Sequence, residues 1–154
     1  LEHVAPPVAL LICGYEREAA PLLAVADQLG WRARVLGPHE APPPLDARSA
    51  AVVMTHSDAR DAELLPQLLA TPARYVGLLG SRARTAQLLA DLRARGALSA
   101  DAALERLHTP AGLDIGAETP GEVALAIAAE IQAVFAGKGG GPLRDRKGHI
   151  HAGR

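Results

Sequence analysis

Two arginines fall in the first turn of a predicted helix, where cations are least expected. The segment Arg74–Thr85 (Arg-Tyr-Val-Gly-Leu-Leu-Gly-Ser-Arg-Ala-Arg-Thr) predicts a short apolar strand, a glycine-serine turn and a helix that starts near Arg82. Arg82 and Arg84 therefore lie at the positive end of the helix dipole, which disfavours cations. An anion held by free backbone N–H groups and both guanidinium groups would offset that cost. Solvated arginines explain the same residues, so this motif alone leaves both interpretations open.

Alternating apolar runs and helical patterns predict the elements that position these arginines. The predicted strands cover Val8–Cys13, Trp31–Leu36, Ala50–Met54 and Tyr75–Leu79, with a last short strand within Leu107–Gly116. The predicted helices cover Glu18–Leu29, Asp58–Leu69, Arg82–Arg95 and Thr119–Phe135, with a short helix capped by Ser99 before the last one. The fold class is therefore α/β: a doubly wound, Rossmann-like parallel sheet with helices on both faces, in three αβα layers.

One Rossmann-like domain is expected to occupy residues 1–154. Residues 1–7 begin with Leu rather than Met and contain two prolines, so we expect a linker within a longer protein. Residues 137–154 form a glycine-rich and then basic tail. Ligands of doubly wound sheets bind at the carboxyl ends of the strands. That rule selects the loops Gly14–Arg17, Gly37–His39, Thr55–Asp58, Gly80–Arg84 and Leu107–Gly116.

Composition excludes several classes of protein. Hydrophobic residues make up 49% of the chain but aromatic residues only 3%, so the core must consist mainly of Ala, Val, Leu and Ile. Lys and Arg total 16 against 17 for Asp and Glu, so the charge favours neither nucleic acid nor an anionic membrane as a partner. The single cysteine excludes an internal disulfide and a cysteine-based metal cluster. With no membrane-spanning run or signal peptide, the expected location is the cytoplasm.

The first strand-to-helix turn departs from the pattern of nicotinamide-binding domains. Such domains have G-x-G-x-x-G here, whereas this chain has Gly14-Tyr-Glu-Arg-Glu-Ala19. Glu16 replaces the glycine that lets the backbone approach the pyrophosphate, and its carboxylate repels phosphates unless Arg17 offsets it. The second predicted strand ends in Leu36-Gly-Pro-His39, without the acidic residue that binds the ribose. NAD or NADP binding in the usual mode is therefore disfavoured.

Four sequence blocks in order resemble the C-terminal Rossmann-like domain of the xanthine dehydrogenase accessory proteins, the XdhC/CoxI family. They are Val52–His56 with Asp61 downstream, Tyr75–Arg82 (Tyr-Val-Gly-Leu-Leu-Gly-Ser-Arg), Leu107–Gly116 (Leu-His-Thr-Pro-Ala-Gly-Leu-Asp-Ile-Gly) and Thr119–Glu130. The segment Gly139–His151 also resembles that family's tail. The chain departs from the family where Glu16 and Arg17 replace a second glycine and a histidine. It also has no counterpart of the family's N-terminal domain, which carries a cysteine associated with molybdenum handling.

The resemblance implies an accessory role without turnover. Proteins of this family are understood to bind the molybdenum cofactor, a pterin dithiolene with a phosphate. They protect it while its molybdenum gains a terminal sulfur, and they help deliver it to a xanthine dehydrogenase-type molybdoenzyme. That enzyme is the expected partner, and the resemblance also allows a cysteine desulfurase and a homodimer. The cofactor-binding residues it implies are Gly14, Thr55, His56, Asp114 and an anion cradle of Gly80, Ser81, Arg82 and Arg84.

Several polar residues also have structural interpretations. His56 could cap a neighbouring strand or face solvent, and Asp114 could hydrogen-bond its own glycine-flanked loop instead of orienting Arg82 or a pterin amine. Structural roles are favoured for Ser57 and Asp58 as helix caps, Asp61 in a first helical turn, Thr119 and Glu122 as a capping box, Glu130 as an ion pair or dimer contact, and Cys13 as a small buried residue. His149 and His151 share a face of the tail, but we assign no metal.

Two other functions remain as alternatives. A nucleotide-dependent oxidoreductase is supported by the fold class and by Gly14 alone. A docking module that contacts the dehydrogenase without binding cofactor is supported by the long helix Thr119–Phe135, which could supply a dimer or docking face. Binding of NADH or NADPH at low micromolar levels would favour the first alternative, and capture of the dehydrogenase by cofactor-free protein would favour the second.

Overall fold

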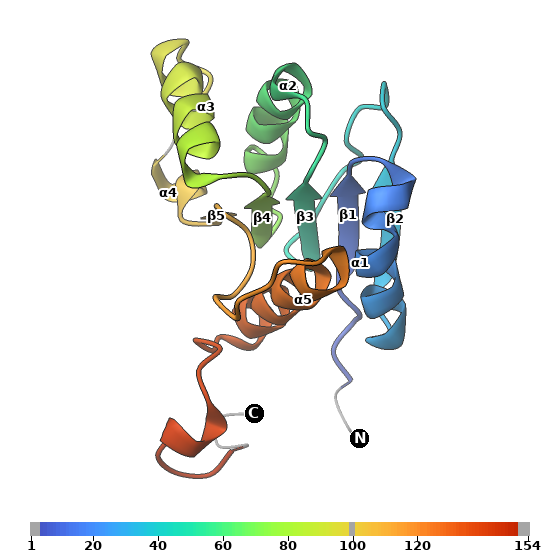
Figure 1. Ribbon diagram of the computed structural model, residues 1–154, viewed down its shortest axis with the longest axis vertical. Coiled ribbons are helices and arrows are strands. Elements are labelled where there is room, and N and C mark those ends of the chain that lie inside the picture. The colour runs from blue at the N-terminus through green and yellow to red at the C-terminus, as the bar shows by residue number, and fades with distance from the viewer. Residues whose placement is uncertain (1–3, 99–100, 151–154) are drawn as a thin grey trace.

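Five parallel strands form the sheet that organises the chain in the computed structural model, which describes residues 4–98 and 101–150 (Figure 1). They are β1 (Ala9–Cys13), β2 (Arg32–Leu36), β3 (Ser49–Val53), β4 (Tyr75–Leu78) and β5 (Leu107–His108). Their order in the sheet is β2-β1-β3-β4-β5, and every neighbouring pair is parallel. Because β2 lies on one side of β1 and β3 on the other, the direction of winding reverses between β1 and β3. Ligands of doubly wound sheets bind at such a switch point.

Helices cover both faces of this sheet, which confirms the predicted three-layer α/β fold. Helices α1 and α5 pack against each other on one face, and α2 and α3 cover the other (Figure 1). The helices are α1 (Glu16–Gln28), α2 (Asp58–Leu69), α3 (Arg82–Ala94), α4 (Asp101–Leu104), α5 (Pro120–Ala136) and a short 3-10 helix (Leu143–Asp145). Ser99, the predicted cap of α4, lies outside the described residues.

The first helix starts earlier than its apolar pattern predicts. Tyr15 is extended, with φ −78° and ψ 141°, and α1 begins at the next residue, Glu16, two residues before the predicted start. Glu16 and Glu18 both lie in this first turn, where the helix dipole favours carboxylates. Arg17 therefore belongs to the helix and not to the loop that precedes it.

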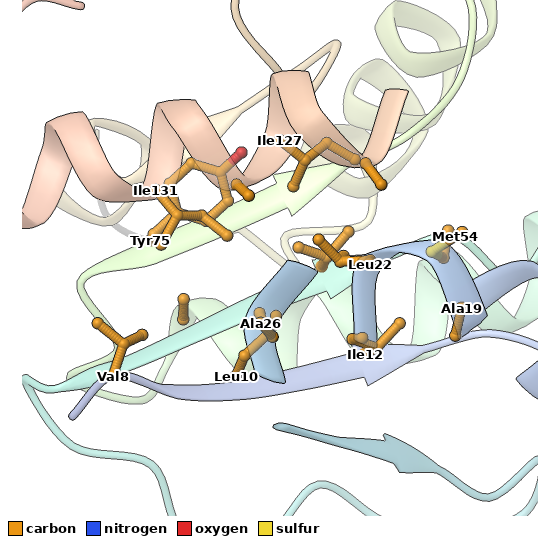
Figure 2. Packing of buried hydrophobic residues seen from close by; sticks show 14 residues of the cluster. Val8, Leu10, Ile12, Ala19, Leu22, Ala26, Met54, Tyr75, Ile127 and Ile131 are labelled. Carbon is orange, nitrogen blue, oxygen red and sulfur yellow. The ribbon is translucent and has the colours of Figure 1, made fainter. Parts of the chain in front are cut away.

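The core has two apolar layers, one on each face of the sheet. Because side chains alternate along a strand, Leu10 and Ile12 of β1 pack with α1 and α5, whereas Leu11 and Cys13 pack with α2 and α3. Figure 2 shows the first layer, to which α1 contributes Leu22 and α5 contributes Ile127. Small and branched aliphatic residues dominate both layers, as the composition predicts. The fully buried Tyr75 is an aromatic exception.

The glycine-rich tail leaves the end of α5 and extends away from the sheet (Figure 1). Two apolar side chains, Leu143 and Ile150, are 62% and 53% exposed there. None of the helices in residues 4–98 and 101–150 has the length and apolar character needed to cross a bilayer.

Candidate ligand site at the switch point

Gly14 ends β1 where the strand order reverses. A Cβ atom at this position would lie 2.9 Å from both the backbone oxygen and the Cγ atom of Met54. Only glycine fits there unless the neighbouring chain moves, because real Cβ atoms keep a greater distance. Gly14 thus lets the carboxyl ends of β1 and β3 lie close together before α1 and α2 leave on opposite faces.

A cavity of about 660 Å³ opens at the carboxyl ends of β1, β2 and β3. Cys13, Leu36 and Leu64 form part of its apolar lining. Its polar lining includes Thr55 and Ser57 from the β3–α2 loop. This volume is within the range of small-molecule sites, and an apolar floor with a few polar groups is their usual character. Three of the predicted loops, those following β1, β2 and β3, therefore meet in one cavity.

A second cavity, of about 530 Å³, lies on the other side of the same loops. Leu22, Met54 and Ile127 line it from α1, from the end of β3 and from α5. Arg17 and His56 also line it. The first turn of α1 and the β3–α2 loop therefore separate two cavities, one on each face of the sheet.

His56 has an unusual backbone conformation for a residue with a side chain. Its φ is +58°, the left-handed region that most such residues avoid. Its Nε2 atom lies 3.0 Å from Glu18 Oε2, so the side chain connects the β3–α2 loop to the first turn of α1. The two side chains are 58% and 45% exposed, so this contact adds little stability. Uncommon backbone conformations of this kind often occur at ligand sites.

The first turn of α1 lacks the side-chain cap that the other long helices have. Ser57, Ser81 and Thr119 each accept a hydrogen bond from a backbone N–H in the first turn of α2, α3 and α5. The side chain of Tyr15, at the corresponding position of α1, accepts none within the described chain. The start of α1, without a side-chain cap among the described residues, thus lies at the switch point, and helix N-termini commonly bind anions.

The structure places Arg84 in a network of protein contacts. Its Nη2 atom donates to Asp61 Oδ2 at 2.7 Å, and its Nε atom donates to Asp58 Oδ1 at 2.7 Å. The hydrogen bond to Asp61 raises the pKa of Arg84 above its already high ordinary value, so the group stays charged. Two carboxylates balance that charge. Arg82, the first residue of α3, is exposed and forms no ion pair within the described residues.

The burial of Asp61 and its hydrogen bonds could not be predicted from the sequence. Asp61 is completely buried, although its position in a first helical turn suggested only an interaction with the helix dipole. The Thr55 hydroxyl donates to Asp61 Oδ1 at 2.5 Å and accepts from the Ser57 N–H at 3.2 Å. Thr55 therefore organises the β3–α2 loop, and its hydroxyl proton is already engaged.

Asp114 lies apart from both cavities. It is exposed in the loop between β5 and α5 and does not line either one. Glu130, by contrast, accepts hydrogen bonds from the Tyr75 hydroxyl at 2.6 Å and from the Gly112 N–H at 3.0 Å. The structure thus places Gly14, Thr55 and His56 at one edge of the sheet, where Gly14 and Thr55 line the first cavity and His56 lines the second, whereas Asp114 lines neither. His149 lies in the exposed tail, and His151 lies outside the described residues.

The fold and the cavity together define a Rossmann-like domain with a crevice at its switch point. The chain belongs to the family described as the XdhC Rossmann domain, whose family model matches residues 10–131. A crystal structure of a xanthine dehydrogenase from Bacillus halodurans superposes with a TM-score of 0.71 and 26% identity, over 86% of this chain and 46% of that one.

Two curated relatives match about half of the chain. The uncharacterized protein YqeB of Escherichia coli (strain K12) is 40% identical over 87 residues, which are 56% of this chain and 16% of YqeB. A probable xanthine dehydrogenase subunit from Bacillus subtilis (strain 168) is 39% identical over 82 residues, which are 53% of this chain and 22% of that protein. The matched segments therefore span less than a quarter of either relative.

Proposed function

We propose that the chain binds the molybdenum cofactor as an accessory factor in the maturation of a xanthine dehydrogenase-type molybdoenzyme. The observation that carries this proposal is the 660 Å³ cavity at the switch point of a domain in the XdhC Rossmann family. The names of two relatives, the probable xanthine dehydrogenase subunit from Bacillus subtilis and the xanthine dehydrogenase of known structure, support the choice of enzyme class. The accessory role and the cofactor come from the family resemblance.

The residues at this edge fit a flat, anionic cofactor. The apolar floor of the cavity suits a ring system, and the uncapped N–H groups of α1 suit a phosphate. Glu16 and Glu18 place negative charge in the same turn, so a phosphate there needs a cation beside it. Arg17 supplies one on that turn and has no ion-pair partner among residues 4–98 and 101–150.

Two exposed arginines at the carboxyl ends of the strands would hold the cofactor: Arg17 on α1, which lines the second cavity, and Arg82 on α3, which lines neither cavity. When bound, the cofactor would supply the dithiolene that carries molybdenum, while the chain binds and shields it. Arg84 would act only indirectly, because Asp58 and Asp61 already balance its charge. In this proposal the predicted cradle is reduced to Arg82 and the Gly80-Ser81 turn, and Arg17 is added.

Gly14, Thr55 and His56 would border the bound cofactor at the switch point. Gly14 keeps the strand ends close, Thr55 shapes the neighbouring loop, and the His56 imidazole would lie beside the anion. Asp114 would contact only a part of the cofactor that extends beyond the cavities.

Anaerobic titration with isolated molybdenum cofactor tests this proposal. We expect saturable binding by the unchanged chain and an affinity about tenfold lower for Arg17→Ala or Arg82→Ala, because each loses a charge-assisted contact. Arg93→Ala is the matched control, since it removes an exposed arginine from the last turn of α3. The proposal is wrong if the unchanged chain does not bind, or if Arg93→Ala weakens binding as much as Arg82→Ala.

The same titration should include NAD(H) and NADP(H). The cavity lies at the ends of β1 and β2, where nucleotides bind in many Rossmann-like domains. Glu40 places a carboxylate near the end of β2, where a nicotinamide-binding domain has its ribose-binding acidic residue. This carboxylate accepts hydrogen bonds from the Gly37 N–H at 3.0 Å and from Arg34 at 2.8 Å. That carboxylate is therefore already engaged, and we expect no micromolar nicotinamide binding. Binding of a nicotinamide alone would favour an oxidoreductase. Capture of the dehydrogenase by cofactor-free chain would favour a docking module.

A further inference from the structure

We propose that Asp61 and Arg84 are a positioning pair, which holds the loops after β3 and β4 against each other beside the switch point. This role concerns how the two loops are held in place, and it does not depend on which ligand binds. It also gives a different reason for the glycine of the Leu-Gly-Ser-Arg block, because the Arg84 side chain passes over Gly80.

Asp61 fixes the first of these loops. Its side chain is fully buried on α2, and both carboxylate oxygens have partners. One oxygen accepts the Thr55 hydroxyl at 2.5 Å, which leaves the Thr55 oxygen oriented to accept the Ser57 N–H. Ser57 in turn caps α2 by accepting the Arg60 N–H at 3.3 Å. The orientation of Asp61 therefore determines how the chain turns from β3 into α2.

Arg84 connects this arrangement to the next loop. Its guanidinium group donates to Asp61 and Asp58 of α2 and, through Nη1, to the backbone oxygen of Leu79 at 3.3 Å. Leu79 follows β4 directly, so one side chain of α3 contacts both the start of α2 and the end of β4. A buried carboxylate is costly unless it is paired, and Arg84 is the cation that pairs with Asp61.

Gly80 provides the space for this connection. A Cβ atom at Gly80 would lie 2.9 Å from Arg84 Nη1 and 3.3 Å from Thr85 Cγ2. Its φ of +151° is also one that residues with side chains rarely adopt. A side chain at this position would push the guanidinium group away from Asp61. The internal contact therefore accounts for Gly80 by itself, whether or not a ligand also approaches its backbone.

Native-state hydrogen exchange can distinguish local positioning from a general loss of stability. The Leu79 N–H donates to Val53 O at the carboxyl end of the β3–β4 pair, and the Arg74 N–H donates to Ser49 O at its amino end, both at 2.9 Å. We expect Asp61→Asn and Arg84→Met each to speed exchange of the Leu79 amide about tenfold or more relative to the Arg74 amide.

A double variant and two milder changes complete the test. Asp61→Asn combined with Arg84→Met should accelerate the Leu79 amide less than the product of the single effects, because no unpaired buried charge remains. Arg84→Lys should recover part of the protection, while Arg82→Met, which removes an arginine without an ion pair among the described residues, should change neither amide. Equal acceleration of both amides, or single effects that multiply, would overturn the proposal.

Gly80→Ala keeps the inference testable if the charge variants do not fold. It should accelerate the Leu79 amide selectively, whereas Gly121→Ala, whose added Cβ meets nothing within 4 Å, should not. No selective effect of Gly80→Ala would count against the positioning role. These measurements need no ligand, so they can succeed even if cofactor binding fails, and cofactor binding can succeed even if they fail.

Discussion

The Tyr75 hydroxyl donates a 2.6 Å hydrogen bond to Glu130 Oε1, which joins β4 to α5 inside the domain. The same oxygen accepts the Gly112 N–H, and the Tyr75 ring stacks on His108 with ring centroids 4.5 Å apart. Tyr75 is completely buried, and burial raises the pKa of its hydroxyl well above the ordinary value. Glu130 therefore has a structural role within the fold. Among the described residues, it is the only hydrogen-bond partner of the buried Tyr75 hydroxyl.

We expect Tyr75→Phe to lower the free energy of unfolding by about 1.5–3 kcal/mol, the usual contribution of a hydrogen bond to a charged group. Phenylalanine keeps the ring and its stacking on His108, so the change isolates the hydroxyl. Urea unfolding of both proteins measures the difference. Tyr15→Phe is the control, because that side chain is 62% exposed, and it should leave the unfolding midpoint unchanged. Equal midpoints for all three proteins would show that the Glu130 contact contributes nothing.

Gly14→Ala should destabilise the protein by about 1–3 kcal/mol, as overpacking of a filled space usually does. The added methyl group would meet the backbone oxygen of Met54 at 2.9 Å, and backbone yields less readily than a side-chain end. Gly121→Ala is the opposite case, because its added Cβ atom would point into open space within α5. This substitution should raise the free energy of unfolding by about 0.5–1 kcal/mol. Thermal or urea unfolding measures the stability of both variants against the unchanged chain. A Gly14→Ala protein as stable as the unchanged chain would contradict the close approach of Gly14 to Met54.

The Cys13 thiol should be inert in the folded protein. It is 1% exposed, and burial raises its pKa to about 12, so almost no thiolate is present at neutral pH. A colorimetric disulfide reagent at about pH 8 should react only after urea is added. Ser81→Cys places a thiol at an exposed position and should react at once in the folded state. Rapid reaction of the unchanged chain would mean that the lining of the cavity opens readily.

The stability contributed by the capping box of α5 should depend on pH. Backbone N–H groups of Thr119 and Glu118 hold the pKa of Glu122 below its ordinary value of 4.5. A lowered pKa in the folded state means that the stabilisation is complete above pH 4.5 and is lost as the pH falls through the lower value.

Glu122→Gln removes this titration while keeping a side chain that can accept a hydrogen bond. The stability difference between the two proteins should therefore be larger at about pH 6 than at about pH 3, in urea unfolding at both. Glu105→Gln, at an exposed position outside the capping box, is the control. A difference that does not change with pH would show that the carboxylate is not held in the folded state.

The helix and strand pattern could be predicted because it depends on local periodicity and on turn residues. The predicted and observed ends of the long helices and of β1 to β4 agree within two residues. The capping box of Thr119 and Glu122 is confirmed, since its spacing and the following proline specify it locally. The caps Ser57 and Ser81 follow the same local rule, although the cap role is predicted from the sequence only for Ser57.

The partners of charged groups could not be predicted from the same pattern. Arg84 lies in a first helical turn with no carboxylate nearby in sequence, and its partner Asp61 is 23 residues away. Pairing across that separation depends on how α2 and α3 pack on the sheet. The Glu130 contact with Tyr75 spans 55 residues and depends in the same way on the packing of α5.

The sequence by itself determined the parallel α/β fold, because apolar runs of strand length alternate with helical periods. It also placed Gly14, Thr55 and His56 at strand ends, which share one edge of any parallel sheet. Only the tertiary structure decided which cations stay free. Burial of Asp61 requires a paired charge, so Arg84 is held within the protein while Arg17 and Arg82 remain exposed to solvent near the carboxyl ends of the strands.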